Sequence, residues 1–249
     1  MKLETVNILI TGGASGLGKA MAIHLVDKAS RIIVVDKNAE LLEQLFSECP
    51  SIKCFTADLT DYQEVVVLVD HIFKEYGKLH VLINNAGIIH SEPLVNILKG
   101  DDARHSLESW HKTIDINLNA VFYVTVNVAE KMVKSRSKGV IINISSISSY
   151  GNSGQSAYSA SKAALNALTL TWSKELGMFG IRCVAIAPGF IDTPSTRAAL
   201  NETKIKEYKN ATPLGRMGKT EEILQAVIFV IENDFYNGTI LNLDGGLKL

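Results

Sequence analysis

The sequence predicts one α/β domain in which seven parallel strands form a doubly wound sheet with helices on both faces. Three observations support this fold class. Short β-branched runs alternate with longer runs of helical periodicity from end to end. The short runs are almost continuously apolar, as strands buried on both faces of a parallel sheet are. No low-complexity linker interrupts the 249 residues, so we expect a single domain over residues 1–249.

Each strand is expected at a short apolar run, and the runs are 6–11, 31–36, 52–57, 79–85, 139–145, 181–188 and 238–243. Helices are expected at the periodic stretches between them, which are 16–28, 38–48, 60–76, 107–134, 157–177 and 220–231. Two segments interrupt the alternation, and both are expected to be long loops: 88–106 and 189–219. Each follows the carboxyl end of a strand, where ligands bind in sheets of this kind, so both are candidate substrate loops.

Composition argues against several classes of partner. The net charge is −1 and no run of lysines or arginines occurs, which disfavours nucleic acid and anionic membrane surfaces. No apolar stretch reaches the roughly 20 residues of a membrane span. The cysteines Cys49, Cys54 and Cys183 are odd in number and lack metal-ligand spacing, which indicates reduced thiols in a cytoplasmic protein.

A glycine-rich turn, TGGASGLG (11–18), lies between the first expected strand and the first expected helix. Gly12, Gly16 and Gly18 would permit a tight turn and let backbone N–H groups approach a pyrophosphate. Their G-x3-G-x-G spacing is wider than the generic dinucleotide fingerprint. Taken alone, the glycines could also mark an ordinary turn between a strand and a helix.

Asp36 strengthens the nucleotide interpretation because it ends the second expected strand, near the usual offset of a ribose-binding carboxylate. A carboxylate there would accept hydrogen bonds from the adenosine ribose and repel a 2′-phosphate. This favours NAD, and makes NADP less likely. Lys37 favours the opposite choice, unless it is simply a solvated lysine in the turn.

Tyr158 and Lys162 are four residues apart in the stretch SAYSASKAAL (156–165), so they share one helix face. A phenol ordinarily titrates near pH 10. A neighbouring ammonium favours the phenolate and lowers the pKa toward the range useful for general acid–base catalysis. The alternative is an ordinary surface Tyr–Lys pair.

Further motifs accompany this pair in a fixed order, and they are TGGASGLG (11–18), DL (58–59), NNAG (84–87), IDIN (114–117), ISS (144–146), YSASK (158–162), PGFIDT (188–193) and LNLDGG (241–246). With these eight motifs, the chain resembles the short-chain dehydrogenase/reductase family over essentially its whole length. The resemblance implies a Rossmann-type fold and hydride transfer between a nicotinamide cofactor and an alcohol or ketone.

The resemblance also implies four catalytic roles. Tyr158 would be the general acid/base, and Ser145 would orient the substrate oxygen. Lys162 would bind the nicotinamide ribose and lower the pKa of the tyrosine. Asn117 would hold a water that links the lysine to solvent.

The cofactor would be bound by matching positions along the chain. Asp58 is expected at the adenine amino group, and Ile191 and Thr193 are expected at the nicotinamide carboxamide. The full set implied is Gly12, Ala14, Ser15, Gly16, Leu17, Gly18, Asp36, Lys37, Asp58, Leu59, Asn85, Ala86, Gly87, Tyr158, Lys162, Pro188, Gly189, Ile191 and Thr193.

No metal site is expected. His90, His105 and His111 fall near the mouth of the expected active site, but their spacings do not converge on a ligand set, so they are interpreted as loop or surface residues.

The substrate is expected to be a small secondary alcohol or ketone, for example a hydroxyacyl or hydroxysteroid compound. FIDTPSTR and PLGRMG resemble the 3-oxoacyl-carrier-protein reductases, which usually use NADPH. The segment 96–110 instead resembles an insertion in the type II 3-hydroxyacyl-CoA dehydrogenases, which use NAD, or it is a surface insertion without a role in selectivity. A 3-oxoacyl-ACP or -CoA reductase using NADPH therefore remains an alternative.

Two other classes remain open. One is a nucleotide-binding regulator that has lost catalysis, although all four expected catalytic residues are present. The other is an isomerising relative that uses bound NAD transiently. Family members commonly form homotetramers or homodimers through helices matching 107–134 and 157–177, and the broadly apolar stretch 164–176 is consistent with such packing.

Overall fold

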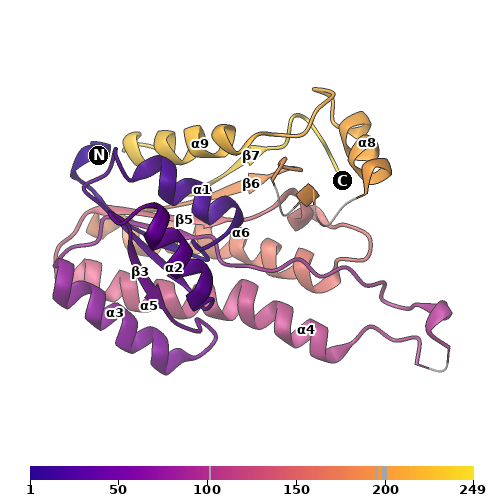
Figure 1. The fold of residues 1–249 in the computed structure, drawn as a ribbon, viewed down its shortest axis with the longest axis horizontal. Coiled ribbons are helices and arrows are strands. Elements are labelled where there is room, and N and C mark those ends of the chain that lie inside the picture. The colour runs from indigo at the N-terminus through magenta and orange to yellow at the C-terminus, as the bar shows by residue number, and fades with distance from the viewer. Residues whose placement is uncertain (101, 194–195, 198–200) are drawn as a thin grey trace.

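Seven parallel strands form one sheet in the order β3-β2-β1-β4-β5-β6-β7 in this computed structural model, which describes residues 1–100, 102–193, 196–197 and 201–249 (Figure 1). The strands are β1 (Asn7–Thr11), β2 (Arg31–Asp36), β3 (Lys53–Thr56), β4 (Val81–Asn84), β5 (Gly139–Ile144), β6 (Ile181–Pro188) and β7 (Thr239–Leu243). The order reverses between β1 and β4, which pair directly from Ile8 to Val81 onward. The predicted doubly wound, seven-stranded parallel sheet is confirmed.

The continuous apolar character of the central strands follows from their burial on both faces. Every residue of β1, β4, β5 and β6 is buried, whereas the edge strands β3 and β7 contain only half-buried and exposed positions. Apolar residues at every position of a central strand therefore contribute hydrophobic stabilisation on both sides of the sheet.

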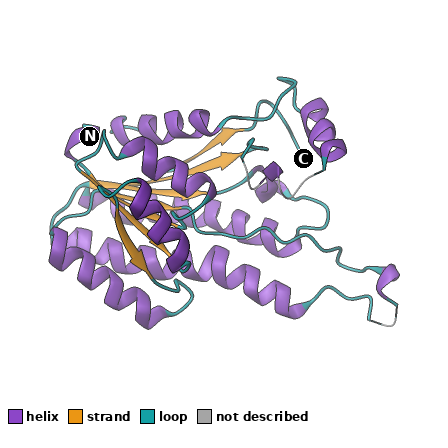
Figure 2. Cartoon of the chain, viewed as in Figure 1, coloured by secondary structure: helices purple, strands orange, loops and turns teal. Residues whose placement is uncertain are grey.

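Helices cover both faces of the sheet (Figure 2). On one face, α1 (Gly16–Leu25), α2 (Ala39–Glu48) and α9 (Thr220–Glu232) share a core with the strands. On the other face, α3 (Tyr62–Tyr76), α5 (Ala120–Lys134) and α6 (Ser156–Leu176) form a second core. In the described part of the chain, no helix combines the length and the apolar character needed to cross a bilayer.

The long helix predicted over 107–134 is present but contains a change of helix type. It consists of α4 (Leu107–Ile114), a π-helical turn η3 (Asp115–Asn119) and α5. Single π turns inside α-helices are rare and often occur at functional sites. This turn contains Asn117, and apolar periodicity alone cannot reveal it because the flanking α-helical pattern continues on both sides.

The segment predicted as a loop over 189–219 contains a helix, α8 (Glu202–Ala211). Its sequence, ETKIKEYKNA, is strongly polar and the helix buries no residue, so the apolar periodicity on which a helix prediction depends is limited to Ile205 and Tyr208. The Asn201 side chain caps its first turn by accepting a hydrogen bond from the Lys204 N–H. Positions 194–195 and 198–200 of the same segment lie outside the described residues.

The other predicted loop, 88–106, folds back on itself as a hairpin-like arm. An antiparallel bridge joins Val95 to Arg104, and the His105 N–H donates to the Leu94 carbonyl at 3.0 Å. A short 3₁₀ helix, η2 (Ile97–Lys99), lies near its tip, and Figure 1 shows the arm extending away from the sheet. We call residues 88–106 the arm.

A buried chain of amide and hydroxyl groups crosses the second core just behind the carboxyl ends of β4 and β5. The Asn84 Nδ2 donates to Thr125 Oγ1 and to Asn143 Oδ1, both at 2.9 Å. The Asn143 Nδ2 donates in turn to Thr169 Oγ1 at 2.9 Å. Asn84 and Asn143 are register partners on neighbouring strands, so this network links the sheet to α5 and α6.

Asn143→Ala should therefore lower the free energy of unfolding by ~2–4 kcal/mol. The change leaves Asn84 and Thr169 each without one partner in a buried site, and each such loss costs ~1–3 kcal/mol. Urea unfolding followed by circular dichroism measures the effect. Asn127→Ala is the control, because the Asn127 amide bonds only its own helix at the Tyr123 carbonyl, and it should change stability by less than ~1 kcal/mol. Equal effects of the two substitutions would contradict the prediction.

Candidate active site

A cleft of about 1020 Å³ lies at the carboxyl ends of the strands, beside the reversal between β1 and β4. This is where doubly wound sheets bind their ligands. Most of the residues predicted from the sequence line it: Gly12, Ser15, Gly16, Leu17, Asp36, Lys37, Asp58, Leu59, Asn85, Ala86, Gly87, Ser145, Tyr158, Lys162, Pro188, Gly189 and Thr193. Four predicted residues are not among the lining groups, and these are Ala14, Gly18, Asn117 and Ile191.

The glycine turn has a backbone that other residues could not adopt. Gly12 has φ +62°, and a Cβ there would lie 2.7 Å from the Cα of Ala86. A Cβ on Gly18 would collide with the Gly12 carbonyl. The close approach of these segments leaves the first turn of α1 open toward the cleft, so its free N–H groups can receive an anion.

Asp36 ends β2 at the cleft. Its Oδ2 accepts from the Ala14 N–H at 3.2 Å and its Oδ1 from the Asn38 N–H at 3.1 Å. A carboxylate accepts up to about four hydrogen bonds, so it retains capacity for a ligand hydroxyl. Ala14 thus acts by orienting Asp36 instead of lining the cleft. A glycine-rich turn beside an oriented carboxylate fits a dinucleotide.

At the adenine end of the predicted trough, Asp58 is held in place by Thr60. The Thr60 hydroxyl and N–H both donate to Asp58 Oδ1, at 2.7 and 2.9 Å. These bonds keep the pKa of Asp58 below its ordinary value. Asp58 therefore stays an anion and can accept a hydrogen bond from an amino group.

Tyr158 and Lys162 lie on one face of α6, and both are buried. The Lys162 ammonium is 5.7 Å from the centre of the Tyr158 ring and donates to the Ile144 carbonyl at 2.8 Å. Burial raises the pKa of Tyr158, and a hydrogen bond with Ser146 partly offsets the rise. The direction is the opposite of the one expected from the lysine alone, because the phenol loses more hydration than sequence spacing reveals.

Burial lowers the pKa of Lys162 from 10.5 to about 8. The Lys162 backbone carbonyl accepts a hydrogen bond from Ser145 Oγ at 3.2 Å, which places that hydroxyl at the cleft beside the tyrosine. The structure therefore brings Ser145, Tyr158 and Lys162 together as the sequence predicts.

Asn117 lies in the π turn with its side chain completely buried. Its Oδ1 accepts from the Ile88 N–H and its Nδ2 donates to the Ile88 carbonyl, both at 2.8 Å. A Cβ on Gly87 would lie 3.0 Å from Asn117 Oδ1 and 3.7 Å from Lys162 Nζ, so the amide is near the lysine. In the contacts seen here, Asn117 secures the start of the arm.

The segment after β6 approaches the cleft closely. The Gly189 N–H donates to the Leu243 carbonyl at 2.9 Å, and a Cβ on Gly189 would lie 2.9 Å from the Cα of Asp244. Thr193 Oγ1 faces Thr196 Oγ1 at 2.8 Å at the cleft wall. Ile191 is buried and bridges to Gly218, so its side chain supports this segment from behind.

Several cleft residues were not assigned a role from the sequence, and three of them have polar side chains close to the expected catalytic group. Ser146 bonds Tyr158, although it lies inside the quoted ISS motif. Gln155 and His111 line the cleft from the start of α6 and from α4. Gln155 precedes the YSASK motif by three positions, and one helical turn of spacing is the signal that could have identified it.

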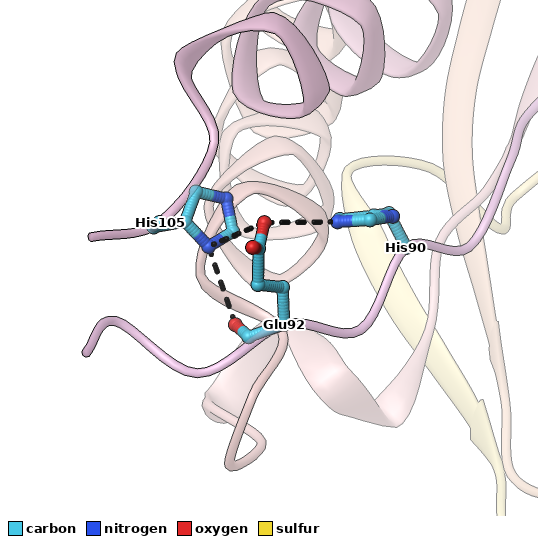
Figure 3. Close-up of side chains that lie close together, drawn as sticks. All are labelled: His90, Glu92 and His105. Atoms are coloured by element: carbon cyan, nitrogen blue, oxygen red, sulfur yellow. Dashed lines mark hydrogen bonds and ion pairs between the residues drawn. The ribbon is translucent and has the colours of Figure 1, made fainter. Parts of the chain in front are cut away.

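The expectation that the histidines do not converge is wrong for two of them. His90 and His105 lie on either side of the Glu92 carboxylate (Figure 3). Ligand atoms of the three residues are within 4.8 Å of one another. We call these residues the His–Glu–His cluster. His111 is not part of it.

The buried lysine gives a testable effect on stability. The folded-state pKa of Lys162 is below the 10.5 of the unfolded chain, so its charge opposes folding fully below about pH 8. The penalty disappears as pH rises toward 10.5. Lys162→Met should therefore raise the free energy of unfolding by ~1–3 kcal/mol at pH 7, and the difference from wild type should shrink by pH 10.

Urea unfolding at pH 7, 8.5 and 10 measures this difference. Lys174→Met is the control, because Lys174 is exposed on the same helix and its removal should give no pH-dependent gap. A Lys162→Met protein that is less stable at pH 7 than at pH 10, relative to wild type, would show that the sign is wrong.

Comparisons with known proteins agree with this geometry. The family model for short chain dehydrogenases matches residues 6–204. The chain is 38% identical to the 3-oxoacyl-[acyl-carrier-protein] reductase of Thermotoga maritima over the full length of both proteins. It is 35% identical to the sorbitol-6-phosphate 2-dehydrogenase of Klebsiella pneumoniae, covering 99% of this chain and 97% of the relative.

A third relative is the 3alpha-hydroxysteroid dehydrogenase of Mediterraneibacter gnavus, which is 33% identical over 100% of this chain and 99% of its own. The three names cover a thioester, a sugar phosphate and a steroid, so the comparisons identify the reaction family and leave the substrate open. The chain belongs to the short-chain dehydrogenase/reductase family of oxidoreductases.

Proposed function

We propose that this chain is an NAD(H)-dependent oxidoreductase that interconverts a small secondary alcohol and its ketone. The observation that carries the proposal is the convergence of Ser145, Tyr158 and Lys162 on the cleft that the glycine turn also lines. One group of side chains handles the substrate proton, and the backbone turn provides the place for a dinucleotide.

The chemistry divides between the cofactor and the protein. A bound nicotinamide would accept the carbinol hydride in oxidation and donate it in reduction. The Ser145 hydroxyl, which donates to the Lys162 carbonyl in this structure, would turn to donate its one hydrogen bond to the substrate oxygen. Tyr158, as phenolate, takes the hydroxyl proton in oxidation and returns it in reduction.

Lys162 supplies positive charge next to the phenol. Its pKa of about 8 keeps a large part of the lysine protonated at neutral pH. A ligand that brings a further positive charge to Tyr158 would oppose the rise that burial causes in the pKa of the phenol. Tyr158 would therefore ionise more readily if an oxidised nicotinamide were bound near it, which is the state in which oxidation requires a base.

Asp36 supports NAD over NADP. Its carboxylate is fixed at the cleft by two backbone N–H groups, so it cannot easily turn away from a 2′-phosphate. Repulsion between the two anions would then weaken NADP. Lys37 also lines the cleft, and it is the residue that would moderate this preference.

For the substrate we propose a hydroxyacyl, hydroxysteroid or similar small compound. A second candidate is reduction of a 3-oxoacyl thioester with NADPH, and the Thermotoga maritima relative named for that reaction favours it. The cleft wall contributed by Phe190 and Thr193 belongs to the segment that resembles such reductases.

We also propose that the enzyme acts in the cytoplasm as a homodimer or homotetramer. All three cysteines are free, as expected for a reducing compartment. Phe122 and Val126 on α5 and Leu170 on α6 are exposed at 46%, 42% and 38%. Apolar side chains of this size on adjacent helices support packing against a second copy.

Tyr158→Phe should reduce kcat at least ~1000-fold while leaving the Kd for NADH within about threefold, because the lost hydroxyl acts on the substrate proton. NAD⁺ reduction with a panel of secondary alcohols and NADH fluorescence titration measure the two quantities. Tyr62→Phe removes a phenol at the start of α3 and serves as the control. Retention of more than about one per cent of the activity would show that another group is the base.

Asp36→Ala should raise KM for NAD⁺ and lower KM for NADP⁺, shifting the ratio of the two kcat/KM values by at least ~100-fold. Asp36→Asn keeps one acceptor and removes the charge, so it separates repulsion from hydrogen bonding. Asp27→Ala, an exposed carboxylate at the end of α1, is the control. An unchanged ratio in both Asp36 variants would mean that Asp36 does not meet the ribose.

A further inference from the structure

The His–Glu–His cluster lies at the base of the arm, outside the group of residues assigned to hydride transfer. His90 Nε2 is 3.3 Å from Glu92 Oε2, and His105 Nδ1 is 3.5 Å from the same oxygen. Two ligand atoms on a tetrahedral ion with bonds of ~2.0–2.1 Å are about 3.3 Å apart. Each of these two nitrogens is therefore about one ligand–ligand separation from the carboxylate oxygen, and a small movement of the side chains would bring all three ligand atoms, now within 4.8 Å of one another, around a single ion.

We propose that His90, Glu92 and His105 bind one divalent transition-metal ion, with Zn²⁺ preferred, and that the ion fastens the base of the arm beside the catalytic cleft. Two imidazoles and one carboxylate are a ligand set that suits zinc, whereas calcium and magnesium favour oxygen-rich sites. Three protein ligands leave a fourth position for water or another oxygen.

Burial prepares two of the ligands for this role. The Glu92 side chain is 8% exposed and the His105 side chain 9%, while His90 is 36% exposed and closes the site from the outside. The Ser106 N–H donates to Glu92 Oε2 at 3.1 Å. A hydrogen bond of this kind orients a ligating carboxylate.

The cluster as it stands leaves a buried polar atom unsatisfied. His105 Nε2 has no hydrogen-bond partner among the described residues. Figure 3 shows the ring edge that carries both nitrogens of His105 turned toward the Glu92 carboxylate. The unpaired nitrogen is the second one on that edge, because Nδ1 also lies 3.3 Å from the Glu92 backbone carbonyl, so a small rotation of the ring would present Nε2 to an ion while Nδ1 keeps that contact.

The backbone brings these residues together from both limbs of the arm. His90 and Glu92 are on the outgoing limb and His105 is on the returning limb, which the His105–Leu94 backbone bond holds in register. An ion would replace a contact between two hydrogen-bonded limbs with coordinate bonds between them. The arm would then be fixed at its base while its tip stayed exposed.

The same base is joined to the catalytic helix. The Glu92 N–H donates to the Gly154 carbonyl at 2.6 Å, and Gln155 Nε2 donates to Ser91 Oγ at 3.2 Å. Gln155 lines the cleft immediately before α6, which carries Tyr158. An ion at the cluster would therefore hold the arm in place against the segment that leads into the catalytic helix.

The test uses the full-length protein, treated with chelator and then dialysed against metal-free buffer. Calorimetric titration with ZnCl₂, together with elemental analysis, should give one zinc per chain with a Kd of ~1 µM or tighter. Replacement by Co²⁺ should give the visible absorption of a four-coordinate site with nitrogen and oxygen ligands. No turnover is measured, so failure of this test would leave the proposed oxidoreductase activity untouched.

His90→Ala is the informative variant, because His90 is half exposed and its loss should not unfold the chain. Zinc affinity should fall at least about tenfold in His90→Ala and in His105→Gln. His71→Ala is the matched control, since His71 forms an exposed pair with Glu75 at 3.0 Å and should not change the affinity.

A second readout follows the arm itself. Zinc should slow amide hydrogen exchange in residues 90–96 and 102–106 of the wild type and leave that of His90→Ala unchanged. Three results would overturn the proposal: no saturable zinc binding, equal binding by wild type and His90→Ala, or cobalt spectra with thiolate absorption from Cys49 or Cys54. The first result would mean that the cluster joins the two limbs of the arm by hydrogen bonds alone.

Discussion

The hydrogen bond from Lys162 Nζ to the Ile144 carbonyl fixes the geometry of the active site. It joins the first turns of α6 to the last residue of β5, with the ammonium completely buried. A shift of the helix along the strand would break this bond and leave a buried ammonium without a partner. Such a loss would cost several kcal/mol, so the position of the helix relative to the strand is fixed. Ser145, one residue beyond Ile144, is tied back to the Lys162 carbonyl and is held in the same register. Tyr158 is positioned relative to the strand end by this one constraint.

Buried polar side chains behind the site also fix the positions of helices relative to the sheet through hydrogen bonds. Asn84 and Asn143 occupy paired positions in strands that are otherwise apolar, and their amides reach α5 and α6. Asn117 lies in a π turn, and from there its side chain bonds both the N–H and the carbonyl of Ile88. Each of these groups stabilises the fold only while its partners are in place, which makes the cleft rigid where the chemistry occurs.

Features that depend on local pattern could be predicted from the sequence, and those that depend on three-dimensional register could not. The sheet was predictable because central strands need apolar residues on both faces, and the Tyr158–Lys162 pair because helical spacing is fixed. The π turn at Asn117 could not be predicted because the apolar periodicity of the helix continues through it. The helix α8 could not be predicted because its sequence is strongly polar and it buries no residue. The raised pKa of Tyr158 depends on burial, which spacing does not report.

The His–Glu–His cluster of the arm is the clearest example of a feature that depends on three-dimensional register and not on local sequence pattern. His90 and His105 are fifteen positions apart, and no local motif relates them. They meet because the chain reverses within the arm: the limbs pair at Val95 and Arg104, His105 lies opposite Leu94, and its ring contacts Glu92 on the outgoing limb. The relatives share the fold over nearly their full length yet are named for chemically different substrates, so selectivity must come from segments outside the common sheet. The arm begins at Ile88 in the cleft wall and is anchored through Asn117, Gly154 and Ser91–Gln155 to the elements that carry the catalytic groups. The arm therefore connects one wall of the cleft to the elements that carry the catalytic groups.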